Sequence, residues 1–278
     1  MDRIGARKVI AGIILSLLIL MGSQGVAFLV SNVLEGIHVP TVLCNVVGGM
    51  TYIILVYVLL KVLVSKYLGG TLEMFGMPKL KVNLKWILVA FLLPLIVISI
   101  YLCMQGRFEH SGMNVREIMN TVSFSIFFIG LGAGFVEEMV FRGIILNILG
   151  EKYGKKVAII APSLLFGFVH IIGMNFNLLS NVLVMIAGTF VGVMFSLIAL
   201  ERHSVWNSAI VHAVWNMMII GNMLSIGEVG NQNSIYSYVL NSKLFVITGG
   251  EFGIESSIIA VIGYIVVAGI AYRGIKSR

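Results

Sequence analysis

Charged residues are scarce in this chain of 278 residues: they make up 11% of it, whereas apolar residues make up 59%. About a quarter of the residues of an average soluble domain are charged. The shortage therefore excludes an ordinary soluble fold and predicts a polytopic membrane protein. A spanning helix needs about 20 residues, so the chain has room for several spans with short connections. We expect residues 1–278 to form a single transmembrane domain.

Other shortages exclude several kinds of intramembrane hydrolase. Asp2 is the only aspartate, which excludes a protease that works with two aspartates. None of the histidines belongs to a His-Glu-x-x-His run, so the helical zinc motif of that type is absent. No Gly-x-Ser-x-Gly turn precedes a candidate base. The two cysteines, Cys44 and Cys103, are most simply small apolar side chains.

The long apolar runs predict an all-α bundle of about eight transmembrane helices. In the sixth run, Gly188 and Gly192 have the GxxxG spacing that is typical of a close contact between two helices. We expect the spans at residues 9–30, 42–64, 86–104, 122–149, 157–172, 181–200, 205–226 and 256–272.

Alternate connections carry most of the basic residues, and this bias predicts that both termini lie in the cytoplasm. On the opposite side are only Arg107, Arg116 and Lys243, while Arg142 lies within a span. The net charge of +7 thus reflects topology in the cell membrane, and we expect the lipid bilayer, not a nucleic acid, as partner. The basic residues on the cytoplasmic side are Arg3, Arg7, Lys8, Lys61, Lys66, Lys79, Lys81, Lys85, Lys152, Lys155, Lys156, Arg202, Arg273, Lys276 and Arg278.

A polar run, Glu137, Glu138 and Arg142, interrupts the fourth predicted span. An uncompensated charge in hydrocarbon costs several kcal/mol, so such residues face a bundle interior or a wet cavity and indicate a functional site. On a helix, Glu138 and Arg142 are four residues apart and can pair, whereas Glu137 points roughly 100° away. The alternative is an ion pair that only orients two helices.

Two later spans carry polar side chains at a matching depth. His170 follows Phe166 by four residues in one span, and Asn216 follows His212 by four in another. Counted from the cytoplasmic helix ends, Glu137 and His170 lie about 20 Å deep and His212 about 12 Å deep. Span ends shift by several Å, so these groups share a layer in the middle of the membrane.

These side chains could hydrolyse a peptide bond in two ways. In the first, Glu137 takes a proton from water with the help of His170. His212 and Asn216 would then donate hydrogen bonds to the oxyanion. In the second, Glu137, His170 and His212 bind a divalent metal such as zinc, which activates the water. The spacing leaves both open, although Asn216 is a poor zinc ligand and mildly favours the metal-free version.

The three motifs resemble those of the CPBP family, the CAAX proteases and bacteriocin-processing enzymes also called Abi, which includes the Ras-converting CAAX endopeptidase. That family carries EExxxR, FxxxH and HxxxN on successive segments of an eight-helix membrane core. The chain has these motifs in that order at 137–142, 166–170 and 212–216, and the resemblance covers about 122–220. Each motif alone is weak, but three in order form a strong signal.

The resemblance implies a role for each motif residue. Glu137 and His170 would activate water, and His212 and Asn216 would stabilise the oxyanion. Glu138, Arg142 and Phe166 would support them. Members of the family are often labelled metalloproteases, so the cofactor is either none or a divalent metal.

We therefore expect an intramembrane endopeptidase that cuts a membrane-associated peptide or protein, in peptide maturation or bacteriocin self-immunity. Because a fold does not fix a function, the alternative is a non-enzymatic membrane scaffold or an immunity protein that binds its target without cutting it. A transporter with a proton-carrying glutamate is a third reading. No inverted repeat or pair of broken helices supports it.

Overall fold

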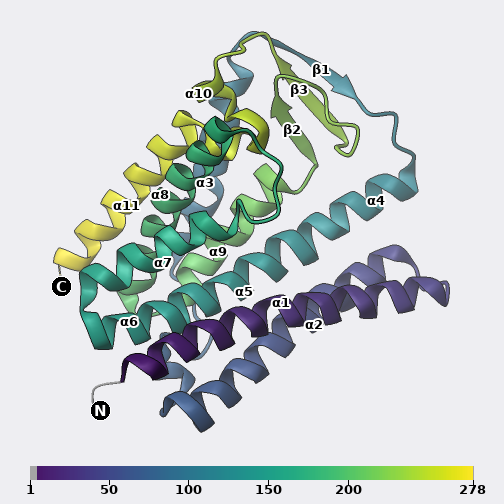
Figure 1. The fold of residues 1–278 in the computed structure, drawn as a ribbon. Coiled ribbons are helices and arrows are strands. Elements are labelled where there is room, and N and C mark those ends of the chain that lie inside the picture. Colours follow the sequence, from purple (N-terminus) through teal and green to yellow (C-terminus); the bar gives the residue numbers. More distant parts are fainter. Residues whose placement is uncertain (1–4, 278) are drawn as a thin grey trace.

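Helices dominate the computed structural model, which describes residues 5–277 (Figure 1). Asp2, Arg3 and Arg278, three residues used above, lie outside the described residues. The first described helix begins, and the last one ends, at the same end of the bundle in Figure 1. The helices are α1 (Ala6–Gly36), α2 (Thr41–Leu63), α3 (Leu84–Leu102), α4 (Val115–Phe124), α5 (Gly134–Glu138), α6 (Leu146–Tyr153), α7 (Lys155–Val169), α8 (Leu178–Arg202), α9 (Val205–Trp215), α10 (Phe245–Thr248) and α11 (Ile258–Lys276).

Helical segments occur in all eight expected spans, but their lengths differ. Among the described residues, six segments are long and apolar enough to cross a membrane: α1, α3, α8, α11, Thr41–Leu68 and Val115–Tyr153. The other two are shorter, since α7 has 15 residues and α9 continues only to Ile220. The protein is thus an all-α, multi-pass membrane protein, while the count of eight crossings stays a prediction.

The seventh expected span, 205–226, was too long, because its last residues belong to a small sheet at the end of the bundle away from the start of α1 and the end of α11 (Figure 1). The sheet consists of β1 (Gly106–His110), β2 (Leu224–Gly227) and β3 (Tyr236–Leu240), in the order β1-β3-β2. β3 pairs antiparallel with β1 and parallel with β2. The sheet thus joins residues from two connections between the expected spans, for which the sequence predicts no strands.

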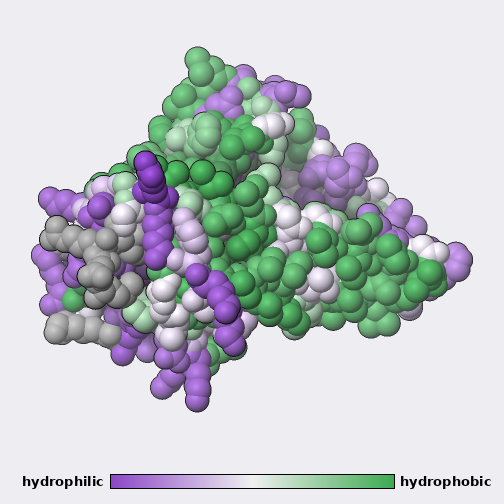
Figure 2. All heavy atoms as spheres, turned by 60° about the horizontal axis from the view of Figure 1, so that its bottom comes forward, coloured by the Kyte–Doolittle hydropathy of each residue, from purple (hydrophilic) through white to green (hydrophobic). Residues whose placement is uncertain are grey.

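The outer face of α1 exposes large apolar side chains, as a lipid-facing helix should. Ile10, Leu18, Met21 and Leu29 are all more than half exposed. Figure 2 shows a broad hydrophobic area on one face of the molecule, with hydrophilic residues gathered mainly at its left end. Contiguous apolar surface of this extent is rare on soluble monomers and marks contact with a membrane or a partner.

The fourth expected span lies within the helical segment Val115–Tyr153. Asn114 begins it with a capping box, in which its side chain and that of Glu117 satisfy each other's backbone N–H groups. Two π-helical stretches, Ser125–Ala133 and Met139–Ile145, flank α5. Wider turns of this kind are frequent at functional sites, and here they bracket the two adjacent glutamates.

Glycines let the helices around these glutamates approach backbone to backbone. A Cβ on Gly134 of α5 would lie 2.7 Å from the Cα of Ala213 in α9. A Cβ on Gly188 of α8 would lie 2.5 Å from the Cα of Gly167 in α7, and one on Gly192 would also meet α7. The helix contact expected from the GxxxG spacing is therefore confirmed, and α5 packs equally closely on α9.

Replacing Gly134 by alanine should push α5 away from α9 and lower the free energy of unfolding by about 1–3 kcal/mol, because overpacked cores cost that much. Gly22→Ala in α1 is the control, since a Cβ there meets nothing within 4 Å. Thermal unfolding of both variants in one detergent measures the difference. Equal midpoints for the two variants would contradict the close contact.

Candidate active site

One cavity of about 430 Å³ lies among α5, α7, α8 and α9. Its walls include Glu137, Phe166, His170, His212 and Asn216. The structure thus brings together all four residues expected to be catalytic, although they come from three separate helical segments. Their similar depths along the predicted spans indicate that these side chains lie close together.

A buried chain of polar contacts joins Arg142, Glu138 and His212. Arg142 Nη1 donates to Glu138 Oε1 at 2.8 Å, and His212 Nδ1 lies 3.0 Å from the same oxygen. Arg142 is 1% exposed and Glu138 0%. An ionised carboxylate only accepts hydrogen bonds, so Nδ1 of His212 carries a hydrogen. Nε2 is therefore the nitrogen left for chemistry, and it lies 3.8 Å from Glu137 Oε2.

Two phenylalanine rings pack against Arg142 and His212. The Arg142 guanidinium lies 4.6 Å from the ring centroid of Phe166 and 5.2 Å from that of Phe195, within the range of a cation–π contact. Phe195 also stacks on His212, with centroids 4.5 Å apart. Phe166 thus contacts Arg142 directly, and its supporting role stays a prediction. Phe195 was missed, because nothing distinguishes it among the apolar residues of α8.

His170 follows the last residue of α7, and its Nδ1 lies 2.7 Å from the carbonyl oxygen of Phe166. A carbonyl only accepts, so Nδ1 carries the hydrogen and Nε2 keeps a lone pair. In the described part of the chain no ion pair joins His170 to Glu137, and the imidazole nearest that carboxylate is that of His212. The sequence predicts that His170 assists Glu137, whereas His212 is the imidazole that lies nearer to it.

Asn216 and Glu137 each leave a hydrogen-bond acceptor unsatisfied in the cavity. Asn216 Nδ2 donates to the carbonyl of Ile129 at 3.1 Å, which keeps one N–H free, while its Oδ1 is buried without a partner. Glu137 Oε2 is likewise buried and unpaired. Buried polar atoms are nearly always hydrogen-bonded, so these two call for a donor such as water or a substrate N–H.

The candidate zinc ligands are not gathered into a metal site. Within residues 5–277, no three His, Cys, Asp or Glu side chains are close enough together to hold an ion. A catalytic zinc normally has three protein ligands, whereas only Glu137 and His212 of the candidate set are near each other. Since the residues as placed do not fit zinc, no step proposed below runs through a metal.

Two further polar residues line the cavity that the sequence did not single out. Gln24 reaches it from α1, and Glu255 reaches it from the 3₁₀ turn before α11. Burial, and secondarily the charge of Glu137, raises the pKa of Glu255 to about 8. In the sequence Glu255 is one of several acidic residues in polar connections, so only its position distinguishes it.

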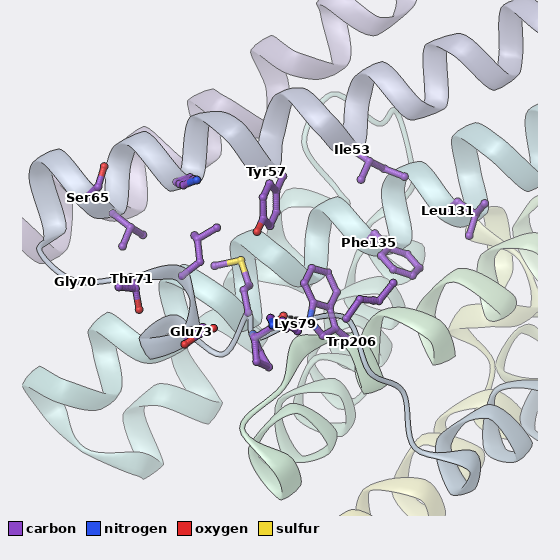
Figure 3. A pocket seen from close by; sticks show the side chains of 16 residues that line it. Ile53, Tyr57, Ser65, Gly70, Thr71, Glu73, Lys79, Leu131, Phe135 and Trp206 are labelled. Atoms are coloured by element: carbon purple, nitrogen blue, oxygen red, sulfur yellow. Dashed lines mark hydrogen bonds between the residues drawn. The ribbon is translucent and has the colours of Figure 1, made fainter.

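A larger groove of about 700 Å³ lies on the other face of the segment that carries Glu137 (Figure 3). Leu131 and Phe135 line it together with Trp206 and Ile53. None of the predicted site residues is among its walls. Its lining near the glutamates is apolar, so the smaller cavity is the one equipped for chemistry.

Comparison with known proteins agrees with the motifs. Residues 119–218 match the family model described as "Type II CAAX prenyl endopeptidase Rce1-like", a stretch that contains all three motifs. Comparisons with curated proteins and with solved structures gave no match.

Glu138→Gln should lower the free energy of unfolding by about 3–5 kcal/mol, because it leaves the charge of Arg142 buried without its partner. Glu137→Gln, one residue away, should change it little, since Glu137 Oε2 has no hydrogen-bond partner to lose. Thermal unfolding of the two variants in the same detergent provides the comparison. A Glu138 variant as stable as its neighbour would disprove the structural role of the pair.

Proposed function

Since the chain carries the Rce1-like segment of the CAAX proteases, a family of intramembrane endopeptidases, we propose that it hydrolyses a peptide bond in a membrane-associated peptide or protein. The main support is the carboxylate of Glu137. It lines a cavity with two imidazoles, and its Oε2 is buried without a hydrogen-bond partner. A hydrolase needs a base of this kind with access to water.

Glu137 serves as the base in this proposal. Arg142 is engaged by Glu138, so the carboxylate of Glu137 is not held in a salt bridge with it and can take a proton from water. His170 contributes the lone pair of Nε2, which can accept the second hydrogen of the same water. The water is then held between two acceptors and is oriented for attack on the scissile carbonyl.

His212 and Asn216 stabilise the negative charge that develops on the carbonyl oxygen. Nδ1–H of His212 is used by Glu138, so the ring donates to an oxyanion through Nε2–H, as an imidazolium. The buried carboxylate of Glu138 stabilises that cation. Asn216 adds the N–H that Ile129 leaves free. Glu138, Arg142 and Phe166 thus act by holding His212 in place.

The setting of the reaction follows from topology and composition. We propose the cell membrane as its place, with both termini in the cytoplasm, in line with the bias of the basic residues. Helix α1 begins and helix α11 ends at the same end of the bundle, as this topology requires (Figure 1). Maturation of a peptide or self-immunity against a bacteriocin is the proposed role.

Glu137→Gln or His170→Ala should abolish cleavage, with a loss of about 10²–10⁴-fold expected for a general base. Cleavage of candidate peptides by reconstituted protein measures it, with Glu35→Gln, an exposed carboxylate of α1, as control. Full activity in either site variant would remove the assignment. A phenotype that survives both substitutions would favour the non-enzymatic scaffold or immunity protein.

Chelation distinguishes the two versions of the chemistry. The carboxylate–water version requires no metal, so a strong chelator should leave the cleavage rate of the reconstituted protein unchanged. The same preparation, assayed before and after exhaustive dialysis against chelator, provides the measurement. Loss of activity that added zinc restores would overturn the metal-free mechanism and show that the site rearranges to bind the ion.

A further inference from the structure

A second carboxylate, Glu255, lines the same cavity as Glu137. Glu255 lies in the 3₁₀ turn Ile254–Ser256, directly before α11. Tyr264, which also lines the cavity, donates its hydroxyl to the backbone carbonyl of Glu255 at 2.9 Å. This hydrogen bond holds the turn against α11 and so fixes the position of the Glu255 backbone.

The cavity does not provide a cation for both carboxylates. Its lining within the described residues contains no lysine or arginine, and the nearby Arg142 is paired with Glu138. Glu137 Oε2 lies 3.8 Å from Nε2 of His212, so an imidazole adjoins this carboxylate. The described structure records no ion pair for Glu255. Two carboxylates in one partly dry site tend to share a proton, so Glu255 is the one that keeps it.

The electrostatics of Glu255 agree with this assignment. Its pKa is raised to about 8, first by burial and then by the charge of Glu137. Glu255 is therefore mostly a neutral carboxylic acid at pH 7 and ionises only as the pH rises past about 8. A neutral acid beside an ionised base is the arrangement by which enzymes obtain two roles from two carboxylates.

We propose that Glu255 is a further catalytic residue, the general acid that protonates the leaving amine while Glu137 serves as the base. The proposal rests on the endopeptidase function above and adds a residue outside the three motifs. Peptide hydrolysis needs such a donor, because an amide nitrogen leaves readily only as a neutral amine.

The proton balance of the reaction closes with these two residues. Glu137 takes a proton from water, the hydroxide forms a bond to the carbonyl carbon, and the carbonyl electron pair moves to oxygen. The electron pair on oxygen then re-forms the C=O bond as the C–N bond breaks. The pair of the C–N bond goes to nitrogen, which takes the proton of Glu255. One proton has then moved from Glu255 to Glu137 overall, and its return across the cavity water resets the site.

Several titratable groups face or adjoin Glu255 and must be considered in its pH dependence. Glu251 belongs to the neighbouring turn, but its Oε2 accepts a hydrogen bond from the backbone N–H of Asn177. Tyr101 is engaged with Ser257 and with the carbonyl of Ile247. The groups are Glu137 of α5, His170 after α7, His212 of α9, Tyr101 of α3, Tyr264 of α11 and Glu251.

Glu255→Gln tests the proposal in the full-length reconstituted protein, with kcat and KM measured from about pH 6 to about pH 10 on a peptide that the wild type cuts. We expect kcat to fall about 100-fold, the usual contribution of a general acid, with KM within about threefold. In the wild type, kcat should decline above about pH 8 as Glu255 loses its proton. The variant should lack that alkaline decline, and Glu255→Asp should recover part of the rate.

Glu251→Gln is the matched control, because glutamine can still accept the hydrogen bond from Asn177 and Glu251 does not line the cavity. A Glu255 variant with the wild-type kcat and pH profile would overturn the inference and leave the function intact, provided that Glu137→Gln is inactive. If Glu255→Gln fails to fold, a wild-type kcat that stays flat above about pH 8 would overturn it equally. Inactive wild-type protein would instead refute the proposed function itself.

Discussion

The buried contact of Arg142 and His212 with a single oxygen of Glu138 is the interaction on which the site depends. Charges in a low-dielectric interior are tolerated only when they are paired and hydrogen-bonded. The contacts with this carboxylate hold the segment after α5, which carries Arg142, and helix α9, which carries His212, in one arrangement. Arg142 also contacts α8, because it donates a hydrogen bond to the carbonyl of Gly192. The tautomer of His212 follows from the same contact.

Two adjacent glutamates can have opposite roles because a helix turns by about 100° per residue. Glu138 faces the arginine and is fully buried, whereas the side chain of Glu137 is 20% exposed and lines the cavity. The close packing of α5 on α9 at Gly134 brings His212 to both of them. The ion pair of Glu138 with Arg142 and the carboxylate of Glu137 therefore coexist within one helical turn. Because Arg142 is paired with Glu138, it does not form a salt bridge with Glu137.

The connections at the sheet end of the bundle affect the chemistry more than their polar sequence suggests. The three-stranded sheet gathers residues from three separate segments at one end of the bundle, and the chain that leaves β3 returns over that end to reach α11. Glu255 lies on this return and so lines the same cavity as Glu137. A carboxyl group supplied from outside the motif helices has its proton affinity set by the cavity rather than by its own turn.

The sequence by itself determined the class of the protein, the Glu138–Arg142 pair and the set of polar residues that meet, because hydropathy and helical spacing are local properties. The match of residues 119–218 to the CAAX protease model agrees with that part. Only the tertiary structure decided that His212 lies next to Glu137, that Phe195 stacks on His212, and that Glu255 enters the cavity. These contacts join segments far apart in the chain, and no local pattern encodes which apolar or acidic residue a distant helix will meet.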